Sequence, residues 1–183
     1  AMKRLSDAAI ARQQVVGYHL KLDTGMGRLG IGPDDVAGFV EDAAGHEGAR
    51  LEGVFSHLSS ADEDDLAYTR QQIRTYTEAV DTIEAAGHRH IVRHVANSAG
   101  TLLHSGSWFD MVRAGLSLYG IHPSRHRGSV ELAPVLSFKT RIAFVKTVPV
   151  GTALGYNRTF KTDRPSLIAT LPVGYADGLA RLA

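Results

Sequence analysis

The sequence predicts an α/β protein in which a parallel sheet or barrel is followed by an antiparallel β region, and two patterns support this prediction. Strand-like and helix-like segments alternate from Val15 to about Gly120, as in folds whose parallel strands are joined by helical crossovers. From Pro134 onward the apolar residues alternate with period two and no helix intervenes, which is typical of antiparallel sheets. A segment rich in proline, glycine and basic residues, between Gly120 and Leu132, is expected to separate the two regions.

The first part of the alternating region predicts a helix, a strand and a second helix. Residues 3–13 have a partly apolar face at helical spacing. Residues 15–22 form the first strand-like run. Pro33 and the two acidic residues after it suit the first turn of a helix, which we expect to continue over residues 36–44.

The second part repeats the alternation. Residues 51–55 predict the next strand. The acidic run at 62–65 is interpreted as the beginning of a long helix that ends at Ala86, rather than as a metal site. The remaining expected elements are a strand, a short helix and a strand, at residues 91–96, 99–104 and 111–114.

Composition excludes several classes of protein. The 20 basic and 19 acidic residues nearly cancel, so the chain has no electrostatic signature of nucleic-acid or anionic membrane binding. With no cysteine, it forms neither disulfides nor thiolate metal sites. No apolar run reaches the ~20 residues of a membrane span, and no signal peptide opens the sequence. We therefore expect a soluble, cytoplasmic protein without a metal centre.

The most informative segment is the glycine-rich loop Lys21–Gly30, with the sequence K-L-D-T-G-M-G-R-L-G. It places Arg28 just beyond the carboxyl end of a predicted strand, which is where ligands bind in α/β proteins. Taken alone, the segment is equally compatible with a turn that carries a solvated arginine.

Polar residues also follow the other predicted strands. His57, Asn97 with Ser98, and Arg113 join Arg28 at strand ends that would converge at one mouth of a barrel. Ser98, at a helix start, offers a hydroxyl and free N–H groups to a phosphate, although an ordinary N-cap explains it equally well. An isolated His57 is more often structural, so the hypothesis of a site depends on all four positions together.

Six blocks of the sequence resemble the alanine racemase family, whose members use pyridoxal phosphate to interconvert L- and D-alanine. The resemblance implies the second half of a (β/α)8 TIM-type barrel over residues 1–122 and the start of a mostly antiparallel β domain over residues 123–183. The blocks are K-L-D-T-G-M-G-R-L-G (21–30), G-V-F-S-H-L-S-S-A-D-E (53–63), H-V-A-N-S-A-G-T-L-L (94–103), M-V-R-A-G-L-S-L-Y-G (111–120), G-Y (155–156) and I-A-T-L-P-V-G-Y-A-D-G (168–178).

The resemblance also implies a role for each matching residue at the cofactor. Arg113 would bond the pyridine nitrogen, and because arginine does not give up its proton the ring would stay unprotonated. Arg28 and Asn97 would hold the phenolic oxygen, and Ser98 the phosphate. The full set of implied cofactor contacts is Arg28, His57, Asn97, Ser98, Arg113, Gly115 and Leu116.

Tyr156 resembles the base that exchanges the α-proton on the L-face, with His57 and Arg113 favouring its phenolate. Tyr175 resembles a residue at the substrate entrance, and Lys21 a lysine that is often N-carboxylated. Because the family's tyrosine reaches the cofactor of the other subunit, the resemblance implies a homodimer. The implied activity supplies D-alanine for peptidoglycan.

One family feature is absent. The lysine that holds the cofactor, in a motif like V-K-A-N-A-Y-G, does not occur, so we expect a fragment that is inactive alone. The alternatives are a racemase of the same fold for serine or a basic amino acid, and a noncatalytic pyridoxal-phosphate-binding module, against which the β region with Tyr156 argues. The lysines present are Lys3, Lys21, Lys139, Lys146 and Lys161.

Overall fold

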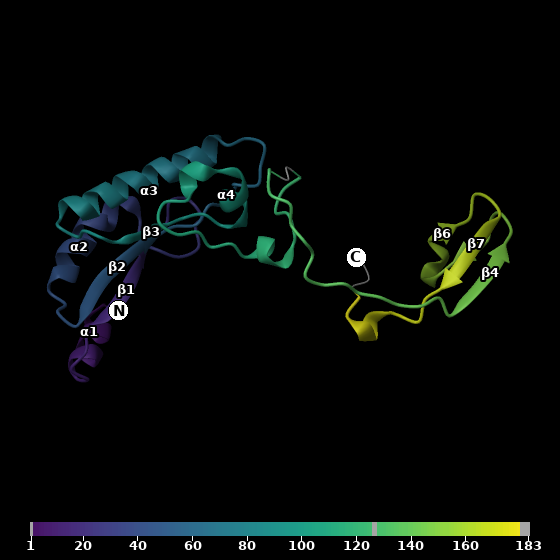
Figure 1. Ribbon diagram of the computed structural model, residues 1–183, viewed down its shortest axis with the longest axis horizontal. Coiled ribbons are helices and arrows are strands. Elements are labelled where there is room, and N and C mark those ends of the chain that lie inside the picture. The colour runs from purple at the N-terminus through teal and green to yellow at the C-terminus, as the bar shows by residue number, and fades with distance from the viewer. Residues whose placement is uncertain (1, 126–127, 180–183) are drawn as a thin grey trace. The chain divides into compact units, whose positions relative to one another are not determined.

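The structure is a computed structural model that describes residues 2–125 and 128–179 (Figure 1). The chain divides into two compact units, Ala1–Val135 and Leu136–Ala183. Each unit is described by itself below.

The first unit contains a three-stranded parallel sheet in the order β1-β2-β3. Helix α2 (Val36–Ala44) connects β1 (Val16–Lys21) to β2 (Ala49–Phe55), and helix α3 (Ala67–Ala85) connects β2 to β3 (Val92–His94). This alternation confirms the α/β architecture expected from the sequence. Two further helices complete the unit, α1 at Met2–Ile10 and α4 at Ser98–Leu103.

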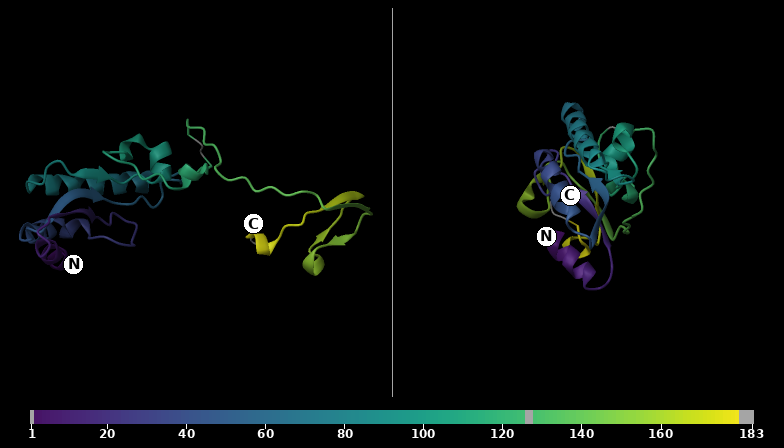
Figure 2. Two further views of the ribbon diagram at one scale, coloured as in Figure 1. Left: turned by 60° about the horizontal axis from the view of Figure 1, so that its bottom comes forward. Right: turned by 90° about the vertical axis from the view of Figure 1, so that its left-hand side faces the viewer.

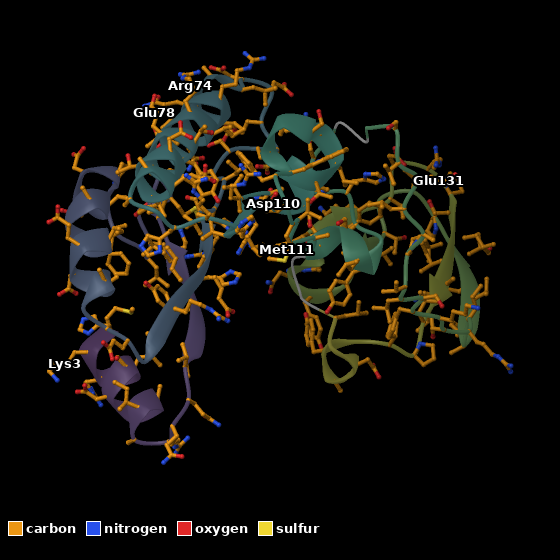
Figure 3. The ribbon with its side chains drawn as sticks, turned by 60° about the vertical axis from the view of Figure 1, so that its left-hand side comes forward. Lys3, Arg74, Glu78, Asp110, Met111 and Glu131 are labelled. Carbon is orange, nitrogen blue, oxygen red and sulfur yellow. The ribbon has the colours of Figure 1, made fainter. Side chains whose placement is uncertain are left out.

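Helices α2 and α3 cover one face of this sheet (Figures 1 and 2). Val40 of α2 and Val80 of α3 pack with Leu20 and Val54 of the strands in a single buried cluster. Apolar residues at helical spacing on the helices and at alternate strand positions bury a common face, which is the usual source of stability in such layers. The polar side of α3 faces solvent, where Figure 3 shows Arg74 and Glu78 pointing outward.

An irregularity in β2 determines what lies on the other face of the sheet. Tyr18 pairs with Leu51, but the next residue, His19, pairs with Gly53, so Glu52 is an extra residue in the ladder. Beyond such a bulge, each residue of the strand points to the opposite face of the sheet from the one that strict alternation would give. The imidazole of His19 consequently lies over Gly53, where an added Cβ would be 2.6 Å from two ring atoms.

The beginning of one expected helix and one expected strand differ from the structure. Helix α3 begins at Ala67 and not at the acidic run. The Asp65 carboxylate accepts the Ala67 N–H (2.9 Å), and this local side-chain bond keeps Asp65 outside the helix. Residues 111–114 are not a strand. Among the described residues, the backbone bonds from this segment to β3 and the residues after it are Asp110 N–H to Arg93 O and Arg113 N–H to Ala96 O, and two bonds three residues apart form no ladder.

The second unit consists of two antiparallel pairs. Strand β4 (Phe144–Val148) pairs with β7 (Ser166–Thr170), and β5 (Ala153–Leu154) pairs with β6 (Phe160–Lys161). The alternating run from 135 to 148 forms a strand only from Phe144, since the last bond toward β7 runs from Ala143 N to Thr170 O. The antiparallel character of this region is confirmed.

Candidate active site

Four residues predicted for the site, three of them basic side chains and one a histidine, lie at the carboxyl ends of the parallel strands: Lys21, Arg28, Arg113 and His57. Burial lowers the pKa of Lys21, Asp23 opposes this effect, and Arg113 and Arg28 add to it. Burial also lowers the pKa of His57, and Arg113, Arg28 and Lys21 lower it further. The lowered pKa favours a neutral His57, and the neighbouring positive charges favour an anionic ligand.

Arg113 is held by acceptors at the ends of β2 and β3. One terminal nitrogen donates to His94 O (2.9 Å) and to the His94 ring, and the other donates to Ser56 O (2.6 Å). Its guanidinium carbon lies 5.5 Å from the centre of the Phe55 ring, and burial lowers its pKa. Within the described residues no protein acceptor meets its Nε–H, so this donor is available to a ligand atom.

Ser98 lies where several donors converge. Its hydroxyl oxygen accepts the N–H groups of Gly115 (3.0 Å) and Ser117 (3.2 Å), and the Ser117 hydroxyl is 3.3 Å away. Ser98 itself is buried at the first turn of α4. Backbone donors aimed at one point form the kind of concavity that binds phosphate oxygens.

Asn97 connects two loops at the same end of the sheet. Its side-chain Oδ1 accepts the Gly100 N–H (3.0 Å) as the N-cap of α4, and its side-chain Nδ2 donates to Leu58 O (3.1 Å). The cap role that the sequence analysis considered for Ser98 therefore belongs to its neighbour.

A pocket of about 360 Å³ lies at this position and contains most of the predicted residues. Arg28 is exposed and does not line it. Asp62, which the sequence analysis assigned to a helix start, does. The lining residues are His57, Asp62, Asn97, Ser98, Ala99, Arg113, Gly115, Leu116 and Pro123.

The loop that carries Arg28 is shaped by Asp23. One carboxylate oxygen of Asp23 accepts the N–H groups of Gly25 (3.0 Å), Met26 (2.9 Å) and Gly27 (3.0 Å). Bonds from Gly27 and Gly25 are the main reason that the pKa of this carboxyl is lowered. Gly27 has a φ of 69°, which L-residues with a side chain rarely adopt.

Sequence reasoning missed a buried polar network behind His57. The Gln72 side chain, fully buried in α3, accepts the Ser59 N–H (2.9 Å) and donates to His57 O (3.2 Å). It also approaches Thr24 Oγ1 (3.4 Å), which lies 2.7 Å from Ser56 Oγ. A glutamine on the apolar side of the α3 repeat was the available signal, because a buried amide needs partners.

Tyr156 and Tyr175 lie in the second unit, each at the first position of a 3₁₀ turn. Both are exposed, Tyr156 by 83%. Their assigned roles stay predictions.

Residues 2–125 and 128–179 contain neither a candidate metal site nor a membrane-spanning helix. No group of three histidine, cysteine or carboxylate side chains in these ranges is placed to hold a metal ion. No helix in them is long and apolar enough to cross a membrane.

Comparison with known proteins connects this geometry to one family. The family model for the alanine racemase N-terminal domain matches residues 1–123, and that for the alanine racemase C-terminal domain matches residues 135–183. Alanine racemase 2 of Caldanaerobacter subterraneus is 42% identical over 183 residues, which cover 99% of this chain and 47% of the relative. Alanine racemase of Desulfovibrio desulfuricans is 43% identical over 97% of this chain and 48% of its own.

Solved structures agree with these matches. The alanine racemase of Streptomyces lavendulae has a TM-score of 0.80 and 35% identity, covering 97% of this chain and 48% of that chain. The Bacillus anthracis alanine racemase, determined with bound L-Ala-P, has a TM-score of 0.72 and 37% identity, covering 96% and 47%. The chain thus spans about half the length of these relatives. The expected combination of barrel segment and β domain is confirmed, and the chain belongs to the alanine racemase family.

Proposed function

We propose that this chain supplies the cofactor cradle and the L-face base of a pyridoxal-phosphate-dependent racemase that interconverts L- and D-alanine. The observation that carries this proposal is the meeting of a half-buried guanidinium, Arg113, with the converging donors at Ser98 in one pocket. A planar cation and an anion cradle are the two features that an aromatic ring with a phosphate group requires. The physiological role we propose is cytoplasmic supply of D-alanine for peptidoglycan.

The residues present fit pyridoxal phosphate. The N–H groups of Gly115 and Ser117 are aimed at the hydroxyl of Ser98, where phosphate oxygens would accept them with the Ser98 hydroxyl as a further donor. Leu116 lines the same pocket. Arg28 and Lys21 contribute the positive potential that an anionic ligand needs. We propose Arg28 and Asn97 as the contacts of the phenolic oxygen.

Arg113 would donate its Nε–H to the pyridine nitrogen. The bound cofactor supplies electron withdrawal from the α-carbon of the amino acid. Because a guanidinium keeps its proton even when burial lowers its pKa, Arg113 would leave the ring nitrogen unprotonated. This moderates the withdrawal and favours return of the proton over side reactions.

Tyr156 would exchange the α-proton on the L-face. A phenol with a pKa near ~10 is a weak base at neutral pH unless cations stabilise its phenolate. Arg113 would provide the positive charge, and a neutral His57 a hydrogen-bond donor, to the Tyr156 of a second copy in a homodimer, with Tyr175 at the substrate entrance.

Lys21 is a candidate for N-carboxylation. Burial and two neighbouring arginines lower the pKa of its amine, and the neutral amine is the form that adds to carbon dioxide with loss of a proton. The resulting anion would pair with Arg28 or Arg113 in place of the like-charge repulsion present now.

The experiment is a chimera in which this chain replaces the matching half of the Caldanaerobacter subterraneus enzyme. We expect it to support growth of a strain that requires D-alanine and to racemise alanine in vitro. Arg113→Lys should abolish most of this activity, because lysine does not reproduce a bidentate planar donor. Arg74→Lys, on the exposed face of α3, is the matched control and should change nothing.

Two results would contradict the proposal. The first is a folded chimera that binds pyridoxal phosphate but racemises serine or a basic amino acid faster than alanine. The second is alanine racemisation by this chain alone together with a borohydride-reducible cofactor adduct on one of its five lysines. The second result would assign the covalent role to a lysine of this chain.

A further inference from the structure

Two histidines from different strands meet beside Arg113. Nδ1 of His19, on β1, lies 2.8 Å from Nε2 of His94, on β3. Strand β2 lies between them, and the contact crosses it because Gly53 has no side chain under the His19 ring. The other ring nitrogen of His94, Nδ1, faces the guanidinium of Arg113.

The contact with Arg113 determines where the ring hydrogens of His94 and His19 lie. A guanidinium only donates, so Nδ1 of His94 must accept and must carry no proton. The proton of the neutral His94 ring is then on Nε2 and is donated to Nδ1 of His19. That nitrogen must also be unprotonated, which places the proton of the His19 ring on its Nε2.

Further contacts hold His94 in place, through both its ring and its backbone. It stacks on Phe55 with ring centres 5.1 Å apart and planes inclined by 6°. Its backbone N–H is donated to the buried hydroxyl of Tyr76 (3.1 Å). His94 is 4% exposed, so solvent does not reach its ring nitrogens freely, and the two ring contacts, with Arg113 and with His19, together select its tautomer.

We propose that His19 is a positioning residue that, through the tautomer of His94, orients Arg113 toward the ring nitrogen of the cofactor. His19 is not among the residues that line the proposed cofactor pocket. Without an acceptor at the position of its Nδ1, the buried Nε2–H of His94 would lose its partner. This cost favours moving the proton to Nδ1, where it would oppose the Arg113 donor. The guanidinium would then have to turn, and its Nε–H would lose its direction. The link to the cofactor rests on the proposed function, whereas the hydrogen positions do not.

The test compares two substitutions of His19 in the full chain. Asparagine retains an acceptor close to the position of imidazole Nδ1, and leucine has a similar size without one. Nitrogen-15 spectra of the histidine rings at neutral pH report which nitrogen carries the proton. We expect the Nε2–H form of His94 in the wild type and in His19→Asn, and a mixture with the Nδ1–H form in His19→Leu.

A second measurement connects the tautomer to the ligand. Affinity for pyridoxal phosphate, measured by equilibrium dialysis, should fall about tenfold in His19→Leu and recover in His19→Asn, which corresponds to one hydrogen bond to a charged group. If the affinity fell only because the variants were less stable, it would not recover when asparagine restores the acceptor. The free energy of unfolding of both variants is measured alongside to compare them at equal folded fractions.

Several outcomes would overturn the inference. They are an Nδ1–H or doubly protonated His94 in the wild type, unchanged spectra in His19→Leu, or equal affinity losses in both variants. If the wild-type chain binds no pyridoxal phosphate, the proposed function fails, and the spectra alone decide whether His19 determines the tautomer of His94.

Discussion

Replacing Gly53 with alanine should displace His19 from its partner. A Cβ at residue 53 would lie 2.6 Å from both Cε1 and Nδ1 of the His19 ring and 2.8 Å from its Cγ. Favourable carbon contacts begin near ~3.5 Å, so the ring must retreat by about 1 Å. The bond from His94 to His19, now 2.8 Å, would then be stretched beyond hydrogen-bonding distance.

The cost can be worked out from two contributions. Forcing a methyl group against a packed ring costs about 1–3 kcal/mol, and breaking a neutral hydrogen bond costs about 1 kcal/mol. We therefore expect the free energy of unfolding to fall by about 3 kcal/mol, with the His94 ring losing its single tautomer.

Gly38→Ala is the matched control for this substitution. Gly38 lies on the exposed side of α2, and an added Cβ would meet nothing within 4 Å. Alanine is the better helix former there, so this change should raise the free energy of unfolding by about 0.5–1 kcal/mol. Urea unfolding of both variants gives the two values. A Gly53→Ala variant as stable as the wild type would refute the placement of the His19 ring over β2.

Three further predictions concern His94, Tyr156 and Ser98. Burial, with Arg113 and His19, lowers the pKa of His94 from 6.5 to about 4, so between these pH values the unfolded chain binds a proton that the folded chain does not. Acidification through this window should reduce the free energy of unfolding by up to about 3 kcal/mol, and urea titrations should show no such loss in His94→Gln. In the chimera, Tyr156→Phe should slow the exchange of the L-alanine α-proton in heavy water by about 10²–10⁴ while D-alanine exchange is less affected, and equal losses would contradict the L-face assignment. Ser98→Ala should weaken binding of pyridoxal phosphate about tenfold but leave the affinity for pyridoxal, which has no phosphate, unchanged in equilibrium dialysis.

Much of the first unit could be predicted because local signals and tertiary packing agree there. Helix α2 occupies the expected residues, 36–44, since proline and acidic residues at its start coincide with an apolar stripe that the sheet buries. The acidic run before α3 misled the prediction because acidic residues favour both a first helical turn and the turn that precedes it. Only the bond from Ala67 to Asp65 distinguishes the two.

The contacts around Arg113 could not be predicted in the same way, because they depend on register. Strict alternation along β2 would point Leu51 and Gly53 to one face of the sheet and Val54 to the other. Leu51 and Val54 nevertheless pack in the same core. The extra residue, Glu52, interrupts the alternation between Leu51 and Gly53, so that Gly53 lies under the His19 ring. Nothing in the local sequence marks this bulge, since its effect is visible only against the neighbouring strand. The proposed cofactor contacts are predicted by their motifs, whereas His19, which we propose to orient one of them, depends on a strand pairing that only the folded chain contains.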